Sequence, residues 1–265
     1  MRHLAIRLAY NGTAYHGWQM QKGDISVQEV LEDALTKVCG EPVKSHGCGR
    51  TDAGVHALRY CADFRTSCTI PVERVALALN ARLPDDICVS DCCEVEDGFN
   101  AILSCKRKEY VYRIHNSRIP DPFNEHRVCF YPGRLNFDDM SRAAGHFVGT
   151  HDFAAVRSVG TETQTTVRTV FRCDMDRQGD ILTLTISADG FLYNMVRAIA
   201  GTLVFAGCGK IDPDSIPELL ELCDRRLTGP TMPPGGLYMN RVWYEGPAGI
   251  MMGTSAPDGT PVFDP

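Results

Sequence analysis

The 265-residue chain contains no apolar run as long as the ~18–20 residues that a membrane-spanning helix needs. It also lacks the opening of a secretory signal peptide, because Met1 to Leu4 leads directly into an alternating strand pattern. Hydrophobic residues make up 44% of the chain and charged residues 23%, which is the balance of an ordinary globular protein. We therefore expect no membrane association and a location in the cytoplasm.

Metal-binding patterns are missing as well, although the chain contains 12 cysteines. No Cys-x-x-Cys pair occurs, and the 8 histidines do not show the spacing of zinc ligands, so we expect no metal site. Since nothing in the sequence indicates export, we interpret the cysteines as reduced thiols that serve as small apolar side chains.

An excess of positive charge is also absent. The formal net charge is −6 at pH 7, from 27 lysines and arginines against 33 aspartates and glutamates. This balance argues against a protein that coats nucleic acid without selectivity. It remains compatible with a local basic cleft, because a nucleic acid responds to the groove that it enters rather than to the total charge.

Strand and helix patterns are present and alternate irregularly along the chain. Residues 4–10 alternate as a half-buried strand, and Ser26 with Glu29 forms a capping box for a helix that ends at Gly40. Residues 110–114 read as another strand. Because the elements mix without regular strand–helix–strand repetition, the sequence predicts an α+β fold with a largely antiparallel sheet.

The chain is long enough for two such domains. Apolar periodicity lapses near Ser104 to Lys108, so we place the domains at residues 1–105 and 106–246. Residues 247–265 are rich in Gly, Pro, Ser and Thr and show no periodicity. We interpret this last stretch as a flexible tail.

The most unusual segment runs from Gly47 to Ala57 and contains three glycines close to a cation, Arg50, and a carboxylate, Asp52. Glycines permit backbone conformations and close approaches that other residues do not. The segment lacks the Lys-Ser/Thr of a phosphate-binding P-loop and the strand and helix that flank a dinucleotide fingerprint. Its spacing leaves open whether Asp52 caps backbone amides in a tight turn or is a reactive group.

A second candidate lies in a helix that we expect from Phe191 to Ala206, which is apolar on every face and has Arg197 as its only charge. A buried guanidinium needs a carboxylate or phosphate partner. Arg197 therefore forms a structural ion pair, reaches the helix edge, or holds a catalytic carboxylate. Tyr110 and Tyr112 share one face of a strand beside cations, a pattern that suits base stacking as well as core packing.

Five segments, in order along the chain, resemble the tRNA pseudouridine synthase A family. The most specific reads Gly-Arg-Thr-Asp-Ala-Gly-Val-His-Ala and contains Asp52. The other four contain the first strand and its loop, the tyrosine strand, the arginine helix and a Pro-Pro-Gly-Gly-Leu-Tyr segment. The five segments are residues 10–19, 49–57, 108–114, 190–197 and 233–238.

The resemblance implies the pseudouridine synthase fold, with two ferredoxin-like α/β domains around a central, largely antiparallel sheet. It also implies isomerisation of uridine to pseudouridine at positions thirty-eight, thirty-nine and forty in the anticodon stem-loop of tRNA. Asp52 would be the catalytic residue, and Arg197 would pair with it. Tyr110 would stack on the target base, Arg50 would hold the flipped nucleotide, and Leu237 would line the base pocket.

The implied partners are tRNA and a second copy of the chain in a homodimer. No cofactor is implied, because the isomerisation needs no redox change and no energy input. Two alternatives are an inactive RNA-binding protein with the same fold and a synthase of this family that acts on another uridine.

The chain departs from the family pattern at two places. It has Asn100 and Ile102 where the family usually has His and Arg, and Met232 where the family usually has alanine. We expect Lys106 and Arg107 to supply the missing RNA-facing charge.

Overall fold

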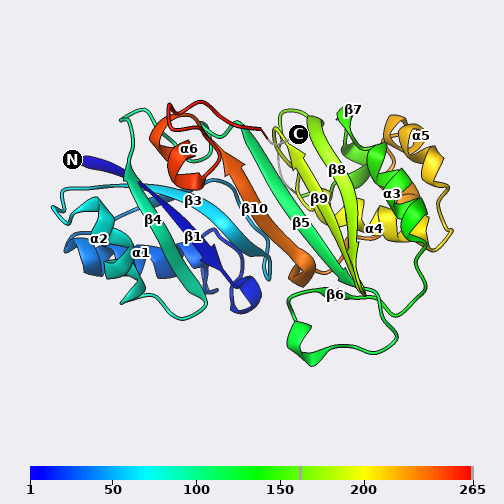
Figure 1. Cartoon of the computed structure of the whole chain (residues 1–265), viewed down its shortest axis with the longest axis horizontal. Helices are drawn as coiled ribbons and strands as arrows, with labels where there is room; N and C mark the ends of the chain where they lie inside the picture. The colour runs from blue at the N-terminus through cyan, green and yellow to red at the C-terminus, as the bar shows by residue number, and fades with distance from the viewer. Residues whose placement is uncertain (161–162, 264–265) are drawn as a thin grey trace. The chain divides into compact units, whose positions relative to one another are not determined.

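The computed structural model describes residues 1–160 and 163–263 (Figure 1). The chain forms two compact units, Met1–Lys108 with Tyr238–Pro265, and Glu109–Leu237. The expected division put residues 106–246 in the second domain. The structure instead groups the strand after Leu237 with the first unit, because Tyr238 and Met239 pair in parallel with the strand at His56 and Ala57.

The first unit begins with six elements in the order strand, helix, strand, strand, helix, strand. They are β1 (Arg2–Tyr10), α1 (Val27–Cys39), β2 (Ser45–Gly47), β3 (His56–Thr66), α2 (Val72–Asn80) and β4 (Ile87–Glu94). The strand order is β4-β1-β3, and β2 and β10 (Leu237–Trp243) both pair with β3. This is the ferredoxin-like arrangement, and β1 is antiparallel to both neighbours.

The local sequence explains how α1 begins and ends. The Ser26 side chain accepts a hydrogen bond from the Glu29 backbone N–H, and Gly40 ends the helix in the left-handed conformation, as predicted. Leu31 and Leu35 of α1 are buried, as are Leu4, Ile6 and Leu8 of β1. In Figure 1, α1 and α2 lie side by side with β1 and β4 crossing in front of them.

The second unit begins at Glu109, within the strand β5, and contains seven further strands and helices. They are β5 (Arg107–His115), β6 (Cys129–Phe130), α3 (Phe137–Gly145), β7 (Gly149–Asp152), β8 (Val167–Gln178), β9 (Ile181–Ala188), α4 (Met195–Gly207) and α5 (Ile216–Glu221). The strand order is β5-β9-β8-β7, and α3 packs on α4 and β8. β8 and β9 form the expected antiparallel hairpin. The predicted α+β class with a largely antiparallel sheet is confirmed.

Two elements differ from the prediction. Helix α4 begins at Met195 rather than at Phe191, because Asn194 adopts a left-handed conformation with φ of 60°. A helix, α6 (Gly246–Met252), occupies part of the segment that we expected to be a loose tail. It packs on β1 and β4 and buries Met251 and Met252. The segment is too short to reveal its periodicity in the sequence. Residues 264–265 of the expected tail lie outside the described residues.

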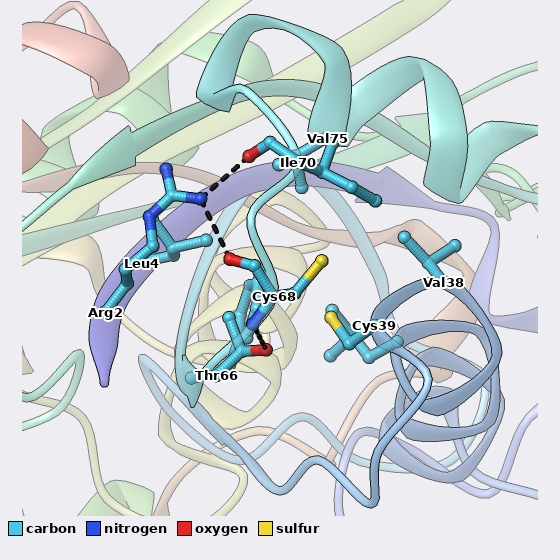
Figure 2. A pocket seen from close by; sticks show the side chains of 10 residues that line it. Arg2, Leu4, Val38, Cys39, Thr66, Cys68, Ile70 and Val75 are labelled. Atoms are coloured by element: carbon cyan, nitrogen blue, oxygen red, sulfur yellow. Dashed lines mark hydrogen bonds between the residues drawn. The ribbon is translucent and has the colours of Figure 1, made fainter.

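A small pocket in the first unit lies between α1 and the chain that follows β3 (Figure 2). Arg2 crosses its rim and donates hydrogen bonds to the carbonyl oxygens of Cys68, at 3.1 Å, and Ile70, at 2.7 Å. The pocket is at the Arg2 end of β1, whereas the Asp52 segment lies near Tyr10 at the other end of the strand. The pocket is therefore not the candidate active site. In the described residues, no helix is long and apolar enough to cross a membrane.

Candidate active site

The segment with Asp52 is an irregular loop, residues 48–55, between β2 and β3. A turn follows the aspartate, because the Val55 N–H donates to the Asp52 carbonyl oxygen at 3.1 Å and Gly54 has a φ of 76°. Asp52 itself is partly exposed, and Arg50 is exposed. The backbone of the loop therefore forms a turn at Asp52, and whether the side chain caps backbone amides or is a reactive group stays a prediction.

The chain between β1 and α1 fixes the backbone of this loop. The Trp18 N–H donates to the Thr51 carbonyl oxygen at 3.2 Å, and the Gly54 N–H donates to the Tyr15 carbonyl oxygen at 3.1 Å. Gly17 approaches the Thr51 carbonyl so closely that a Cβ atom would lie 2.1 Å from its oxygen. Residues 10–19 and 49–57, two of the segments that resemble the family, therefore contact each other around Asp52.

Aromatic side chains form the base of the loop. The Trp18 ring stacks on the Tyr60 ring with 4.2 Å between their centroids. The Tyr60 hydroxyl donates a hydrogen bond to the Gly49 carbonyl oxygen. At the far end of the loop, His56 accepts a hydrogen bond from the Gly12 N–H at 3.0 Å through Nδ1. The backbone on both sides of Asp52 is thus held by named contacts.

Arg197 lies in the first turn of α4, in the second unit. Its Nε atom donates to the Met232 carbonyl oxygen at 2.6 Å, and Nη1 donates to the Asn194 side-chain oxygen at 2.8 Å. The helix around it is buried as predicted, and the arginine itself is half-buried, which is compatible with the alternative that it reaches the helix edge. The Met232 departure leaves the contact with Arg197 intact, because that contact uses the backbone.

The tyrosine strand β5 contacts the residue next to Met232, the partner of Arg197. The Tyr112 hydroxyl donates to the Pro233 carbonyl oxygen at 2.8 Å, and burial raises its pKa well above the ordinary value. Gly236 packs on the Tyr112 ring, where an added Cβ would lie 2.9 Å from a ring carbon. Leu237 follows and is buried. The Tyr110 ring stands edge-on to Phe191, with 5.0 Å between the centroids.

Three of the five resembling segments therefore come together within the second unit. They are the tyrosine strand from Glu109 on, the chain around Arg197 and the segment up to Leu237. The remaining two come together within the first unit around Asp52.

The cations expected to face RNA are placed differently. Arg107 is buried at 7% exposure, and its guanidinium lies 5.1 Å from the centroid of the Trp243 ring. The expectation of an RNA-facing Arg107 is thus wrong, because its place on β5 points the side chain into the core. Lys106 is exposed, and its Nζ atom lies 3.3 Å from a carboxylate oxygen of Glu245. Asn100, at one departure from the family pattern, accepts hydrogen bonds from two backbone N–H groups of its own turn.

Sequence reasoning did not single out the residues that support the loop. Tyr10, Trp18 and Tyr60 form an aromatic cluster beneath it, and Tyr10 also reaches Thr51. The available signal was the unusual aromatic and glycine content of residues 10–19, which indicated a family but no role. In the described residues, no group of three or more His, Cys, Asp or Glu side chains is arranged to hold a metal ion.

Known proteins identify the family. The family described as tRNA pseudouridine synthase matches residues 6–102 and 143–245. The chain belongs to this family. It is 45% identical over 244 residues to the tRNA pseudouridine synthase A of Thermoanaerobacter sp. (strain X514), covering 92% of this chain and 100% of the relative. The corresponding protein of Acetivibrio thermocellus gives the same identity and coverage.

This tRNA pseudouridine synthase is therefore an isomerase that converts uridine in tRNA to pseudouridine, as the sequence predicted. Among solved structures, the archaeal box H/ACA sRNP Nop10-Cbf5 complex aligns with a TM-score of 0.37 and 11% identity. That alignment covers 76% of this chain and 43% of the other. This structural similarity is too weak to indicate a function. The chain is assigned to the family by the match of its sequence.

Proposed function

We propose that this synthase modifies uridines at positions thirty-eight, thirty-nine and forty in the anticodon stem-loop of tRNA, with Asp52 as its catalytic carboxylate. The observation that carries the assignment of Asp52 is the construction of its loop. Hydrogen bonds to Thr51, Asp52 and Gly54 fix the backbone, while the Asp52 side chain stays partly exposed. Such an arrangement suits a reactive group that must be both positioned and reachable.

The reaction rearranges bonds without a net change in atoms. The N1–C1′ bond of uridine breaks, the uracil turns, and a C5–C1′ bond forms. C5 loses its proton and N1 gains one. Because a base within a helix cannot be reached, the target uridine must first be flipped out of its stack. Asp52 attacks C1′ of the sugar or removes the C2′ proton to give a glycal, and either role needs its carboxylate ionised.

The other residues are proposed to bind the substrate. Tyr110 stacks on the target base and keeps the detached uracil in place while it turns, and Leu237 lines the base pocket. Arg50, which is exposed on the Asp52 loop, holds the flipped nucleotide through its phosphate. Arg197 is proposed to pair with Asp52, because the planar guanidinium is suited to orienting a carboxylate. Its contacts with Met232 and Asn194 fix the orientation of the guanidinium.

The protein is further proposed to act on tRNA in the cytoplasm as a homodimer whose two copies both contact one tRNA. Light scattering at micromolar concentration should give the mass of two chains. A fully active monomer would contradict the dimer without affecting the assignment of Asp52.

Tritium release tests the proposed function directly. Unmodified tRNA with tritium at C5 of its uridines should release the label to water on incubation with the protein, and mapping should place pseudouridine at the three proposed positions. Pseudouridine at another uridine would refute the proposed target but retain the chemistry. Tight binding of tRNA without any release of label would indicate an inactive RNA-binding protein.

A further inference from the structure

A pair of buried hydroxyl groups lies directly behind the Asp52 loop. The Tyr10 hydroxyl and the Thr51 Oγ1 atom share a hydrogen bond of 2.9 Å. Tyr10 is 4% exposed and Thr51 is 8% exposed, so water cannot readily replace either partner. A buried hydroxyl that loses its partner is left with an unmet hydrogen-bonding requirement, and the bond therefore specifies one arrangement of the two side chains.

Tyr10 lies at the end of β1, where the pairing of β1 with β3 changes register. Along β1, Leu8 pairs with Tyr60 and Tyr10 pairs with Ala57, so two residues of β1 span the same distance as three residues of β3. The extra residue of this β-bulge lies in β3, so the register of β3 changes opposite Tyr10. The Tyr10 ring is then packed against Trp18, at 6.4 Å, and Tyr60, at 5.6 Å between centroids.

The backbone and the side chain of Thr51 are held by different hydrogen bonds. Its carbonyl oxygen already accepts from the Trp18 N–H, and the carbonyl of Asp52 accepts from the Val55 N–H. These bonds fix the peptide groups, while the hydroxyl bond to Tyr10 holds the Thr51 side chain on the buried side of the loop. The Asp52 side chain is the adjacent one and is directed by the same stretch of backbone.

We propose that the Tyr10–Thr51 hydroxyl pair is a positioning device that sets the direction of the Asp52 carboxylate. Neither residue touches the reacting atoms. The proposal rests on the catalytic role proposed for Asp52 and adds the residues that aim it. Burial raises the pKa of Tyr10 well above its ordinary value, so the phenol remains neutral and acts only as a hydrogen-bonding group.

The test compares Tyr10→Phe, Thr51→Val, the double variant and Thr51→Ser in single-turnover assays at saturating tRNA. Tyr10→Phe and Thr51→Val should each slow the reaction about 10- to 100-fold, the range expected when a reacting group is misplaced by a fraction of an ångström to about 1 Å. The affinity for tRNA should stay within about twofold, since neither side chain is proposed to contact RNA. The double variant should be no slower than the slower single variant, because both remove one bond.

Thr51→Ser keeps the hydroxyl and should retain most of the parent rate. Tyr244→Phe provides the matched control in the same unit. Tyr244 is fully buried, and its hydroxyl donates to the Ala101 carbonyl oxygen at 2.6 Å. Its removal should lower the melting temperature about as much as Tyr10→Phe does, with a rate within about twofold of the parent.

Three results would overturn the proposal: a parent-like rate for Tyr10→Phe, an equal loss of rate for Thr51→Ser and Thr51→Val, or an equal loss for Tyr244→Phe. Asp52→Asn is measured in parallel. If that variant is inactive while Tyr10→Phe is unaffected, only the positioning proposal fails. If Asp52→Asn keeps the parent rate, the catalytic role proposed for Asp52 fails as well.

Discussion

The Asp52 loop and the Arg197 helix place their functional side chains in different ways. Asp52 stands on a loop whose shape depends on contacts from a separate segment, including the Trp18 N–H and the close approach of Gly17. Arg197 stands in the first turn of α4, a regular helix, and its partner outside the helix is the Met232 backbone, which contacts both its side chain and its carbonyl oxygen. A loop can be displaced by changes in its neighbours, whereas a helix residue is affected mainly by changes to itself.

This difference predicts where distant substitutions will harm catalysis. Around Asp52, residues that never touch RNA should affect the rate, because they determine the path of the loop. Around Arg197, the guanidinium itself should be the sensitive group, and conservative changes elsewhere in the buried helix should act mainly on stability.

Apart from replacement of Asp52, the largest expected effect is that of Gly17→Ala. A Cβ atom there would lie 2.1 Å from the Thr51 carbonyl oxygen, and Gly17 has a φ of 80° that other residues rarely adopt. The change should lower the free energy of unfolding by about 1–3 kcal/mol. It should also slow single turnover by ~100-fold, because the loop must move. Chemical denaturation and tritium release measure the two effects.

Gly249→Ala is the control for this substitution. Gly249 lies in α6 of the same unit, far along the chain from the Asp52 loop. A Cβ atom at Gly249 would lie 2.3 Å from the Tyr244 carbonyl oxygen. It should destabilise the protein by a similar amount and leave the rate of the folded enzyme nearly unchanged. Equal rate losses for both glycines would show that the loop has no special sensitivity.

The second largest effect is expected for substitutions of Arg197 itself, the functional side chain of the helix. Arg197→Lys keeps the charge but loses the planar fork that contacts Met232 and Asn194. Single turnover should slow by about 10- to 100-fold, with a much smaller loss of tRNA affinity. Arg197→Met should be slower still and yet fold, because the surrounding helix is apolar. A variant with weaker binding and an unchanged rate would make Arg197 a phosphate contact instead.

The smallest expected effect is a pH-dependent loss of stability in the first unit, away from both sites. Hydrogen bonds from Thr66 and then Ser67 lower the pKa of Glu41 from 4.5 to about 2. A depressed pKa in the folded state adds stability at pH values above 4.5, and this stability is lost as the pH falls toward about 2. Glu41→Gln should therefore lower the melting temperature at pH 7, and the difference should shrink below pH 4.5.

Glu96→Gln, which replaces an exposed carboxylate of the same unit, is the control for the loss of one negative charge. A difference for Glu41→Gln that stays constant from neutral to acid pH would contradict the assigned hydrogen bonds.

The sequence predicted those parts of the fold that depend on local patterns. The capping box at Ser26 and the end at Gly40 gave α1 correctly, and the alternation in β1 gave a buried strand. The start of α4 was missed because the left-handed conformation of Asn194 is set by its surroundings, including the Asn194 side-chain bond to Ser158. Helix α6 was missed because seven residues contain too little periodicity to stand out from a loop.

The candidate residues were found through resemblance rather than through physical pattern. Spacing left Asp52 open between a turn residue and a reactive one, and a backbone turn at a partly exposed residue is compatible with both. The Tyr10–Thr51 bond joins the end of β1 to the loop before β3, which are far apart in sequence. No local rule predicts such a pairing, because it depends on strand register.

The most direct test of the central claim is the single-turnover rate of Asp52→Asn with C5-tritiated tRNA. The amide has nearly the same shape as the carboxylate but can neither attack the sugar nor accept a proton. The variant should fold, bind tRNA within about threefold of the parent, and lose at least ~1,000-fold in rate. Release of tritium within about tenfold of the parent rate, from a folded variant that saturates with tRNA, would contradict the role of Asp52.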